Sequence, residues 1–367
     1  MIVYIFIFLI LLLFRFVFQK KFFFPKNSNC SIVAQRKKVD AFLLASFLLL
    51  LFFTAFRGEK VGIDVPEYLR WFQKFNSLGW KRTFEIEKDI ELGYLCINYI
   101  ISRFTLDPHY LIITVSFFIL FLHITFLKKS SRDFFLSLML FLSFNHFFTS
   151  MCSWRQFIAM GIVFFAYPLF FEKKYICAIF VMGFAFLFHF TTILFDVSVL
   201  IAYVFSRKKK WLVLFLLFCI FFPPFFEKLF FSVIEIIPKY SIYANSKYQT
   251  LGTVGKLRYA YIIIEFFIIF YVIVTKNMRN RSINFMCIML CFSIFIGLLG
   301  AKIPLIFRLG YYFDYFLVLI IPDLICIRGK KNKASLKLAV VFWGFLFYLY
   351  YMLTNSAGMI PWYMYNR

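Results

Sequence analysis

The chain has 367 residues, of which 63% are hydrophobic and only 16% are charged, and its formal net charge is +24. A soluble domain is about half apolar and about a quarter charged, so this composition excludes a soluble protein. The apolar runs repeatedly reach the ~20 residues that a helix needs to cross a bilayer. In hydrocarbon a helix pairs its own backbone groups, so we expect an all-α, polytopic membrane protein.

The apolar runs predict about twelve transmembrane helices within a single integral membrane domain, residues 1–367. In chain order they cover 2–18, 40–56, 108–127, 133–150, 155–171, 175–189, 191–205, 211–231, 259–275, 283–300, 305–327 and 337–354. No basic segment precedes the first run and no small-residue cleavage site follows it, so we expect a retained helix rather than a signal peptide. The spans at 175–189 and 191–205 are short, which predicts half-inserted or broken helices around His189.

Basic residues gather between the apolar runs, and these segments hold more than half of the 41 Lys and Arg. The segments are 19–38, 128–132, 172–174, 206–210, 276–281 and 328–337. By the positive-inside rule they face the cytoplasm, which places both termini outside. The same placement favours contact with anionic headgroups over nucleic-acid binding.

Two longer polar segments then face outward, residues 57–107 and residues 232–258. Seven of the chain's 17 carboxylates lie in 57–91. "PEYLRWFQKF" starts with a proline and places apolar residues along one side, which predicts an interfacial helix. "LGYLCINYIISRF" (92–104) predicts another. The first segment is therefore interpreted as a folded polar element on the outer face.

Three arginines lie at the predicted outer ends of spans: Arg57, Arg155 and Arg308. The alternative interpretation of Arg57 is a long side chain that extends to the membrane interface and has no site role. Arg155 has no acidic residue near it in sequence. Helical spacing places Tyr311, three positions after Arg308, on the same helix face as Arg308. Guanidinium groups pair bidentately with phosphate, so the three together predict a pyrophosphate site at the membrane surface.

Three residues are candidates for a general base: Asp64, Glu91 and His189. Asp64 follows two glycines, Glu91 enters an apolar stretch, and His189 lies between two short spans. A buried, structural histidine is the alternative for His189. The eight cysteines form no C-x-x-C pair, and a lone D-x-E string at 89–91 is weak evidence for a metal, so we expect no disulfide, no metal and no cofactor.

Seven short motifs in order resemble the EpsG/Wzy family of bacterial polysaccharide polymerases, which build exopolysaccharide, capsule or O-antigen. They are "FRGEKVGIDVPEY" (56–68), "ELGY" (91–94), "WRQFIA" (154–159), "FLFHFTTIL" (186–194), "YSIYANSKY" (240–248), "FRLGYYFDYFLVLIIP" (307–322) and "IPWY" (360–363). Each motif is loose, but the ordered set covers nearly the whole chain.

The resemblance implies a multi-pass glycosyltransferase of the bacterial cytoplasmic (inner) membrane, with the helical architecture of GT-C-like lipid-linked sugar transferases. Its substrates would be polyprenyl-pyrophosphate-linked oligosaccharides, joined on the outer leaflet with polyprenyl pyrophosphate, typically undecaprenyl pyrophosphate, as leaving group. A flippase and a chain-length regulator are the implied protein partners, beside membrane lipids. The three arginines would hold the pyrophosphate, the three candidate bases would serve the acceptor sugar, and supporting or sugar-binding residues would be Tyr68, Trp154, Gln156 and Tyr311.

Two other functions remain open from the sequence. A flippase or transporter of lipid-linked oligosaccharides would use Asp196, Glu227 and Glu265, although the chain shows no internal repeat of the kind that transporters often have. An outer-leaflet glycan ligase would share the arginines and use another acceptor.

Overall fold

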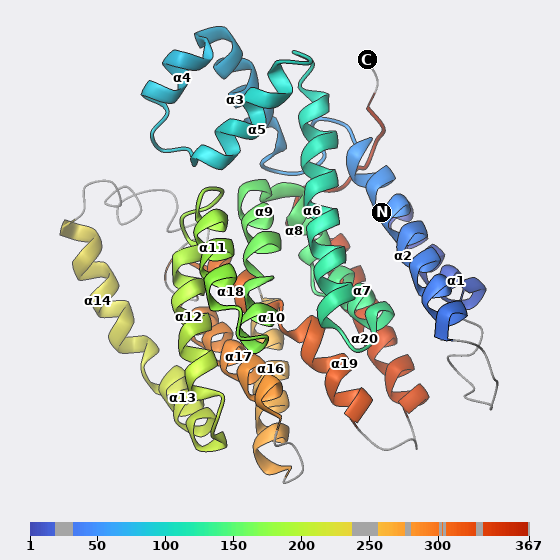
Figure 1. The fold of residues 1–367 in the computed structure, drawn as a ribbon, viewed down its shortest axis with the longest axis vertical. Helices are drawn as coiled ribbons and strands as arrows, with labels where there is room; N and C mark the ends of the chain where they lie inside the picture. Colours follow the sequence, from blue (N-terminus) through green and yellow to red (C-terminus); the bar gives the residue numbers. More distant parts are fainter. Residues whose placement is uncertain are drawn as a thin grey trace. The chain divides into compact units, whose positions relative to one another are not determined.

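The computed structural model describes residues 1–18, 32–236, 256–275, 280–300, 303, 306–327 and 333–365. Within these ranges every regular element is a helix, which confirms the all-α prediction (Figure 1). The chain forms two compact units. Unit 1 comprises residues 1–169, 174–192 and 322–367, and unit 2 comprises residues 170–173 and 193–321.

Several helices are long and apolar enough to cross a membrane. In the described part of the chain there are five: His109–Ser130, Trp154–Phe171, Arg281–Leu299, Phe307–Ile327 and Lys333–Thr354. Two bent helix pairs bring the number to as many as seven, and shorter apolar helices include Ile2–Phe18. The chain is therefore a multi-pass membrane protein, and the count of twelve spans stays a prediction.

Two apolar runs predicted as single spans are broken in the structure. The run at 133–150 divides into α7 (Phe134–Ser143) and α8 (His146–Cys152), bent by 60° at Asn145, whose left-handed φ is 62°. Asparagine adopts this conformation more readily than most residues. The run at 211–231 divides into α13 (Lys209–Phe221) and α14 (Pro223–Ile236), bent by 55°. Pro223 lacks the N–H that would continue the first helix.

Unit 1 is a helix bundle with three small helices at one end (Figure 1). In the bundle, α2 (Ile32–Ala55) packs on α1 (Ile2–Phe18) and on α6 (His109–Ser130), and α9 (Trp154–Val163) packs on α6 and on α11 (Tyr175–Phe186). On the other side α7 packs on α20 (Lys333–Thr354). The short helix α10 (Ala166–Phe171) follows α9.

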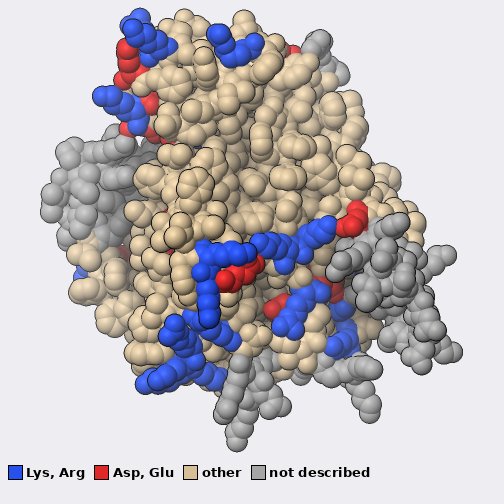
Figure 2. Space-filling view, in the orientation of Figure 1, with Lys and Arg blue, Asp and Glu red and all other residues tan. Residues whose placement is uncertain are grey.

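The small helices are α3 (Val65–Leu78), α4 (Trp80–Ile86) and α5 (Leu92–Ser102), and they lie together where α2 ends (Figure 1). Proline in the first turn of α3 and Gly79 at its end, with φ 79°, set its limits. Its apolar side is buried, as the spacing predicts, including Phe72 and Phe75. Figure 2 shows acidic and basic side chains mixed at this end of the unit. Helices occur at both places predicted within segment 57–107, and their interfacial position on the outer face stays a prediction.

Arg57 is a completely buried hub just after α2. Its Nε donates to the carbonyl oxygen of Val61 at 3.1 Å, and its Nη1 and Nη2 donate to those of Thr54 at 2.6 Å and Met151 at 2.9 Å. Nη1 also lies 3.3 Å from Ser116 Oγ. Burial lowers the pKa of the guanidinium to about 10, so it stays cationic at neutral pH. One charge thereby satisfies backbone carbonyls at the ends of α2 and α8 that have no partner within their helices.

The glycines around Arg57 admit the C-terminal segment. Gly58 N–H donates to the carbonyl oxygen of Tyr363 at 2.8 Å, and Gly62 N–H donates to that of Gly358 at 2.9 Å. A Cβ on Gly58 would lie 1.9 Å from the Tyr363 ring, and Gly62 has φ 116°. The charged interruption after α2 is thus the place where segment 358–365, with its "IPWY" motif, packs within unit 1.

Unit 2 is built around α17 (Arg281–Leu299), which packs on α13, α16 (Lys256–Val274) and α18 (Phe307–Asp314). The unit also contains nearly all of α12 (Thr192–Phe205) and the first residues of α19 (Leu317–Ile327). Arg258 joins its helices, because Nη1 lies 2.8 Å from Asp314 Oδ2 and Nη2 donates to the carbonyl oxygen of Ser293 at 2.6 Å. Ser293 Oγ in turn donates to Glu265 at 2.6 Å. Most of the predicted polar segment 232–258 lies outside the described residues, as does the motif at 240–248.

Replacing Gly58 by alanine is expected to destabilise unit 1, because the new Cβ meets the Tyr363 ring and overpacking of this kind costs about 1–3 kcal/mol. Gly183→Ala is the matched control, since nothing lies within 4 Å of a Cβ at that position in α11. Thermal unfolding of the two purified variants in detergent measures the difference. Equal melting temperatures for both would contradict the packing described for the C-terminal segment.

Candidate functional site

Glu91, Arg155 and His189 form one cluster in unit 1, which we call the Glu91 cluster. Glu91 Oε2 accepts from Arg155 Nη1 at 2.5 Å, and Glu91 Oε1 lies 2.8 Å from His189 Nδ1. The three residues come from the N-terminal cap of α5, the first turn of α9 and the turn after α11. Residues far apart in sequence thus meet at one carboxylate.

The backbone holds α5 tightly against the turn that carries His189. Gly93 N–H donates to the carbonyl oxygen of Leu187 at 2.7 Å. A Cβ on Gly93 would lie 2.8 Å from that oxygen and 3.0 Å from the Phe188 ring. Thr192 Oγ1 donates to the carbonyl oxygen of His189 at 3.0 Å and steadies the other side of the turn. The glycine of "ELGY" is therefore what allows Glu91 to reach His189.

Aromatic rings enclose Arg155. Its guanidinium carbon lies 5.2 Å from the centre of the Trp71 ring, within cation–π range. Tyr68 stacks on Trp154 with centroids 4.7 Å apart and meets Trp71 edge-on at 5.5 Å. Both rings come from α3, where Tyr68 is buried and Trp71 is half-buried. This small helix therefore supplies an aromatic wall beside the charged groups.

The neighbouring groups keep Glu91 ionised. Burial acts to raise the pKa of Glu91, but the hydrogen bond with His189 and the charge of Arg155 outweigh it, and the pKa lies below its ordinary value of 4.5. An ionised carboxylate only accepts hydrogen bonds, so His189 Nδ1 carries the proton. In the neutral imidazole Nε2 is then the basic nitrogen, and it has no hydrogen-bond partner among the described residues.

The three side chains of the Glu91 cluster differ in their exposure. The side chains of Arg155 and His189 are 21% and 18% exposed, whereas that of Glu91 is 9% exposed. A molecule at the surface would therefore meet the guanidinium and the imidazole, and the carboxylate lies behind both. The arrangement offers a base and a cation side by side, held by one anion.

The other predicted site residues lie in different surroundings. Arg57 is enclosed behind the aromatic wall, with its guanidinium carbon 5.8 Å from the Trp154 ring, and it shares the Met151 carbonyl with Trp154 Nε1. It supports the start of α9, and we assign it no contact with substrate. Asp64 immediately precedes α3, and its predicted role as a base stays a prediction.

Gln156 is buried in α9 next to Arg155. Arg308 is an exposed cation on α18 of unit 2, and the Tyr311 ring lies 6.3 Å from that of Phe307 on the same helix. The predicted role of Arg308 at a phosphate stays a prediction.

Sequence reasoning missed three residues: Trp71, Gly93 and Arg258. Trp71 follows Tyr68 by three positions on a predicted helix, so helical spacing places them together. Gly93 is part of the "ELGY" motif, and glycines often occur where the backbone closely approaches another group. Nothing in the sequence near Arg258 pairs it with Asp314, which lies 56 positions away.

No group of three or more His, Cys, Asp or Glu side chains that would hold a metal ion occurs in the described ranges. The model of the EpsG family matches residues 40–366, nearly the whole chain. The chain belongs to the EpsG family. EpsG is a Wzy-like family of polysaccharide polymerases. No curated protein and no solved structure matches the chain. The Glu91 cluster of this EpsG protein lies entirely within the matched region.

The lowered pKa of Glu91 predicts an acid-sensitive EpsG fold. A carboxyl group with a depressed pKa in the folded state stabilises the protein fully above its ordinary pKa of 4.5 and loses that contribution as the pH falls through the folded value. The melting temperature of the wild type should therefore exceed that of Glu91→Gln at pH 7, and the gap should shrink below pH ~4. A gap that is the same at both pH values would contradict the ionised, paired state.

Gly93→Ala tests the backbone contact that positions the cluster. The added Cβ should push α5 away from Leu187 and separate Glu91 from His189, so polymer formation should fall about tenfold or more even when the protein still folds. Gly183→Ala in the neighbouring helix is again the control. Full activity in Gly93→Ala would show that the close approach of α5 is unimportant for function.

Proposed function

We propose that this EpsG-family protein joins polyprenyl-pyrophosphate-linked oligosaccharide repeat units into a surface polysaccharide at the Glu91 cluster. The single observation that carries the proposal is the imidazole of His189, which Glu91 orients from behind and which stands beside the cation Arg155. Glycosyl transfer to a sugar hydroxyl with a pyrophosphate leaving group needs both a base and a fixed positive charge.

In the proposed reaction the acceptor hydroxyl oxygen attacks the anomeric carbon of the growing glycan. A new C–O bond forms to the acceptor, the C–O bond to phosphate breaks, and polyprenyl pyrophosphate leaves with the bonding electron pair. The hydroxyl proton passes to Nε2 of His189, which releases it to solvent before the next cycle. Ionised Glu91 keeps Nδ1–H in place and stabilises the imidazolium that forms, as a carboxylate does behind a catalytic histidine.

Arg155 is proposed to face the departing pyrophosphate. A guanidinium has five N–H donors, and Glu91 takes one of them through Nη1. Tyr68 is also hydrogen-bonded to the Arg155 side chain, and Nε is buried. Trp71 packs against the guanidinium and restricts its orientation, so the donors that stay accessible are presented with little loss of side-chain entropy. Tyr68 and Trp154 hold this wall rigid, and Trp71 offers a ring face on which a sugar can stack.

The proposal includes the membrane setting. The basic segments between apolar runs support an orientation with twelve spans and both termini outside, in which α3, α4 and α5 would lie at the outer leaflet of the bacterial inner membrane. Lipid-linked repeat units would reach the cluster there, in the manner of GT-C-like enzymes. A flippase that delivers them and a chain-length regulator are the proposed partners.

Single substitutions test the three roles. Arg155→Ala should leave the protein level unchanged and collapse the lipid-linked glycans to single repeat units, because the leaving group loses its counter-charge. His189→Ala should slow polymer formation by about 10²–10⁴-fold, the usual contribution of a general base. The rate of polymer formation in Glu91→Gln should lie between the rates of the wild type and of His189→Ala. The length distribution of lipid-linked glycans on a gel measures all three.

Arg70→Ala is the matched control, because this arginine is on α3 but is exposed and pairs only with its helix neighbour Glu67. Arg70→Ala should give lipid-linked glycans with the wild-type length distribution on the gel. Normal-length ladders from Arg155→Ala or His189→Ala would remove that residue from the mechanism. Accumulation of single repeat units on the inner leaflet in these variants would instead indicate a flippase.

A further inference from the structure

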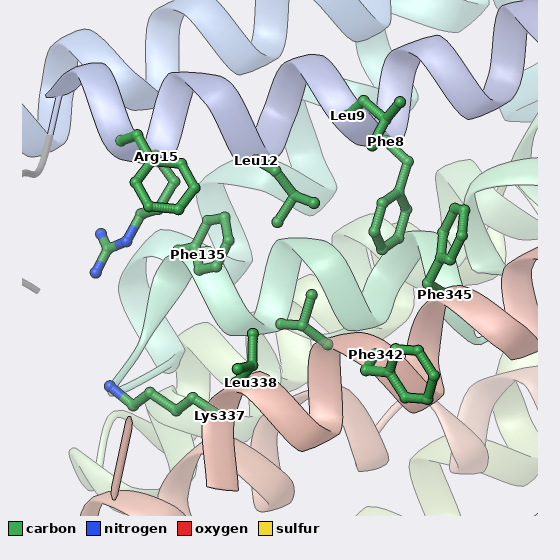
Figure 3. A pocket seen from close by; sticks show the side chains of 11 residues that line it. Phe8, Leu9, Leu12, Arg15, Phe135, Lys337, Leu338, Phe342 and Phe345 are labelled. Carbon is green, nitrogen blue, oxygen red and sulfur yellow. The ribbon is translucent and has the colours of Figure 1, made fainter. Parts of the chain in front are cut away.

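An apolar groove of about 250 Å³ runs between α1, α7 and α20 of unit 1 (Figure 3). Its apolar wall is made by side chains of all three helices: Phe8 and Leu12, Phe135, and Leu338, Phe342 and Phe345. The Phe8 and Phe345 rings meet at 4.9 Å and close one end of it. Such a groove has the shape and chemistry of a site for a hydrocarbon chain.

The opposite end of the groove carries two cations, Arg15 and Lys337, whose side-chain nitrogens both lie at the left of Figure 3. Arg15 is 3% exposed, and its guanidinium carbon lies 5.0 Å from the Phe135 ring. Lys337 Nζ lies 2.6 Å from Asp133 Oδ2, and the same carboxylate accepts the Leu136 N–H as the N-terminal cap of α7. Among Arg15, Lys337 and Asp133 one positive charge is in excess.

The cationic end points away from the Glu91 cluster. Helix α1 runs antiparallel to α20. Near the start of α1, the carbonyl oxygen of Tyr4 accepts a hydrogen bond from the hydroxyl of Tyr348, which is near the end of α20. The Tyr4 hydroxyl donates to the carbonyl oxygen of Met359, just beyond α20. Met359 lies close to Gly62 in the Arg57 region. Arg15 and Lys337 are at the other ends of the same two helices. The groove is therefore separate from the candidate active site.

We propose that this groove binds one anionic phospholipid, with an acyl chain along the apolar wall and the phosphate group on Arg15 and Lys337. The complementarity has two parts, because an apolar trough suits a hydrocarbon chain and the excess charge selects a negative headgroup. On the orientation proposed above, this lipid belongs to the inner leaflet. Only that leaflet assignment rests on the proposed function, since the binding itself depends on the groove alone.

Native mass spectrometry of the purified, delipidated protein in detergent tests the proposal. Phosphatidylglycerol and phosphatidylcholine with identical acyl chains are added in separate titrations, and inorganic phosphate in a third. We expect a retained 1:1 adduct with phosphatidylglycerol at a concentration at least about fivefold lower than with phosphatidylcholine, and no adduct with phosphate. Equal retention of the two lipids, or an adduct with phosphate alone, would overturn the proposal.

Variants locate the adduct. Arg15→Gln combined with Lys337→Gln should lower phosphatidylglycerol retention to the phosphatidylcholine level, whereas Lys128→Gln, an exposed cation that pairs with Asp40 outside the groove, should change nothing. Val341→Trp fills the groove without altering charge and should reduce retention of both lipids, which keeps the test decisive if the double variant unfolds. Wild-type lipid retention in Val341→Trp would show that the lipid binds elsewhere and would overturn the proposal. A loss of glycan polymerisation with normal lipid retention would concern the Glu91 cluster and leave the lipid site standing.

Discussion

A single carboxylate, that of Glu91, ties together the parts of unit 1 to which we assign the proposed chemistry. Glu91 holds the guanidinium of Arg155 with one oxygen and the imidazole of His189 with the other. Each contact constrains a different segment, α9 in one case and the turn after α11 in the other. Because an ionised carboxylate accepts and never donates, it also decides which nitrogen of His189 carries a proton. Position and protonation of the proposed base therefore have one common cause.

The Glu91 cluster depends in turn on packing at the end of α2. Arg57 satisfies backbone carbonyls from two helices, and its neighbour Trp154 stacks on Tyr68 of the aromatic wall. Gly58 and Gly62 admit the C-terminal segment to the same place. A charged residue in an apolar chain is here a structural device, because the buried guanidinium donates to carbonyl groups from separate segments. The same residue type thus has different roles in one unit: Arg57 builds the support, and Arg155 faces the exposed side.

The sequence predicts the class of fold well and the site only in part. Long apolar runs predict a helical, multi-pass membrane protein, as the structure shows, and the spacing of apolar residues predicts helices at the positions of α3 and α5. Breaks at Asn145 and Pro223 divide runs whose hydropathy is continuous, so hydropathy alone does not reveal them. Glu91, Arg155 and His189 are each recognisable as polar residues in apolar surroundings. Their pairing depends on tertiary contacts across 64 and 98 positions, which no local pattern encodes.

The most direct measurement is an experimental structure of the protein with a lipid-linked repeat unit bound in a bilayer mimetic. The account predicts the pyrophosphate within hydrogen-bonding distance of Arg155, and an acceptor-sugar hydroxyl within about 3.2 Å of His189 Nε2. Glu91 should remain bonded to Nδ1 of the same ring. Substrate bound in a pocket that includes neither Arg155 nor His189 would contradict the account.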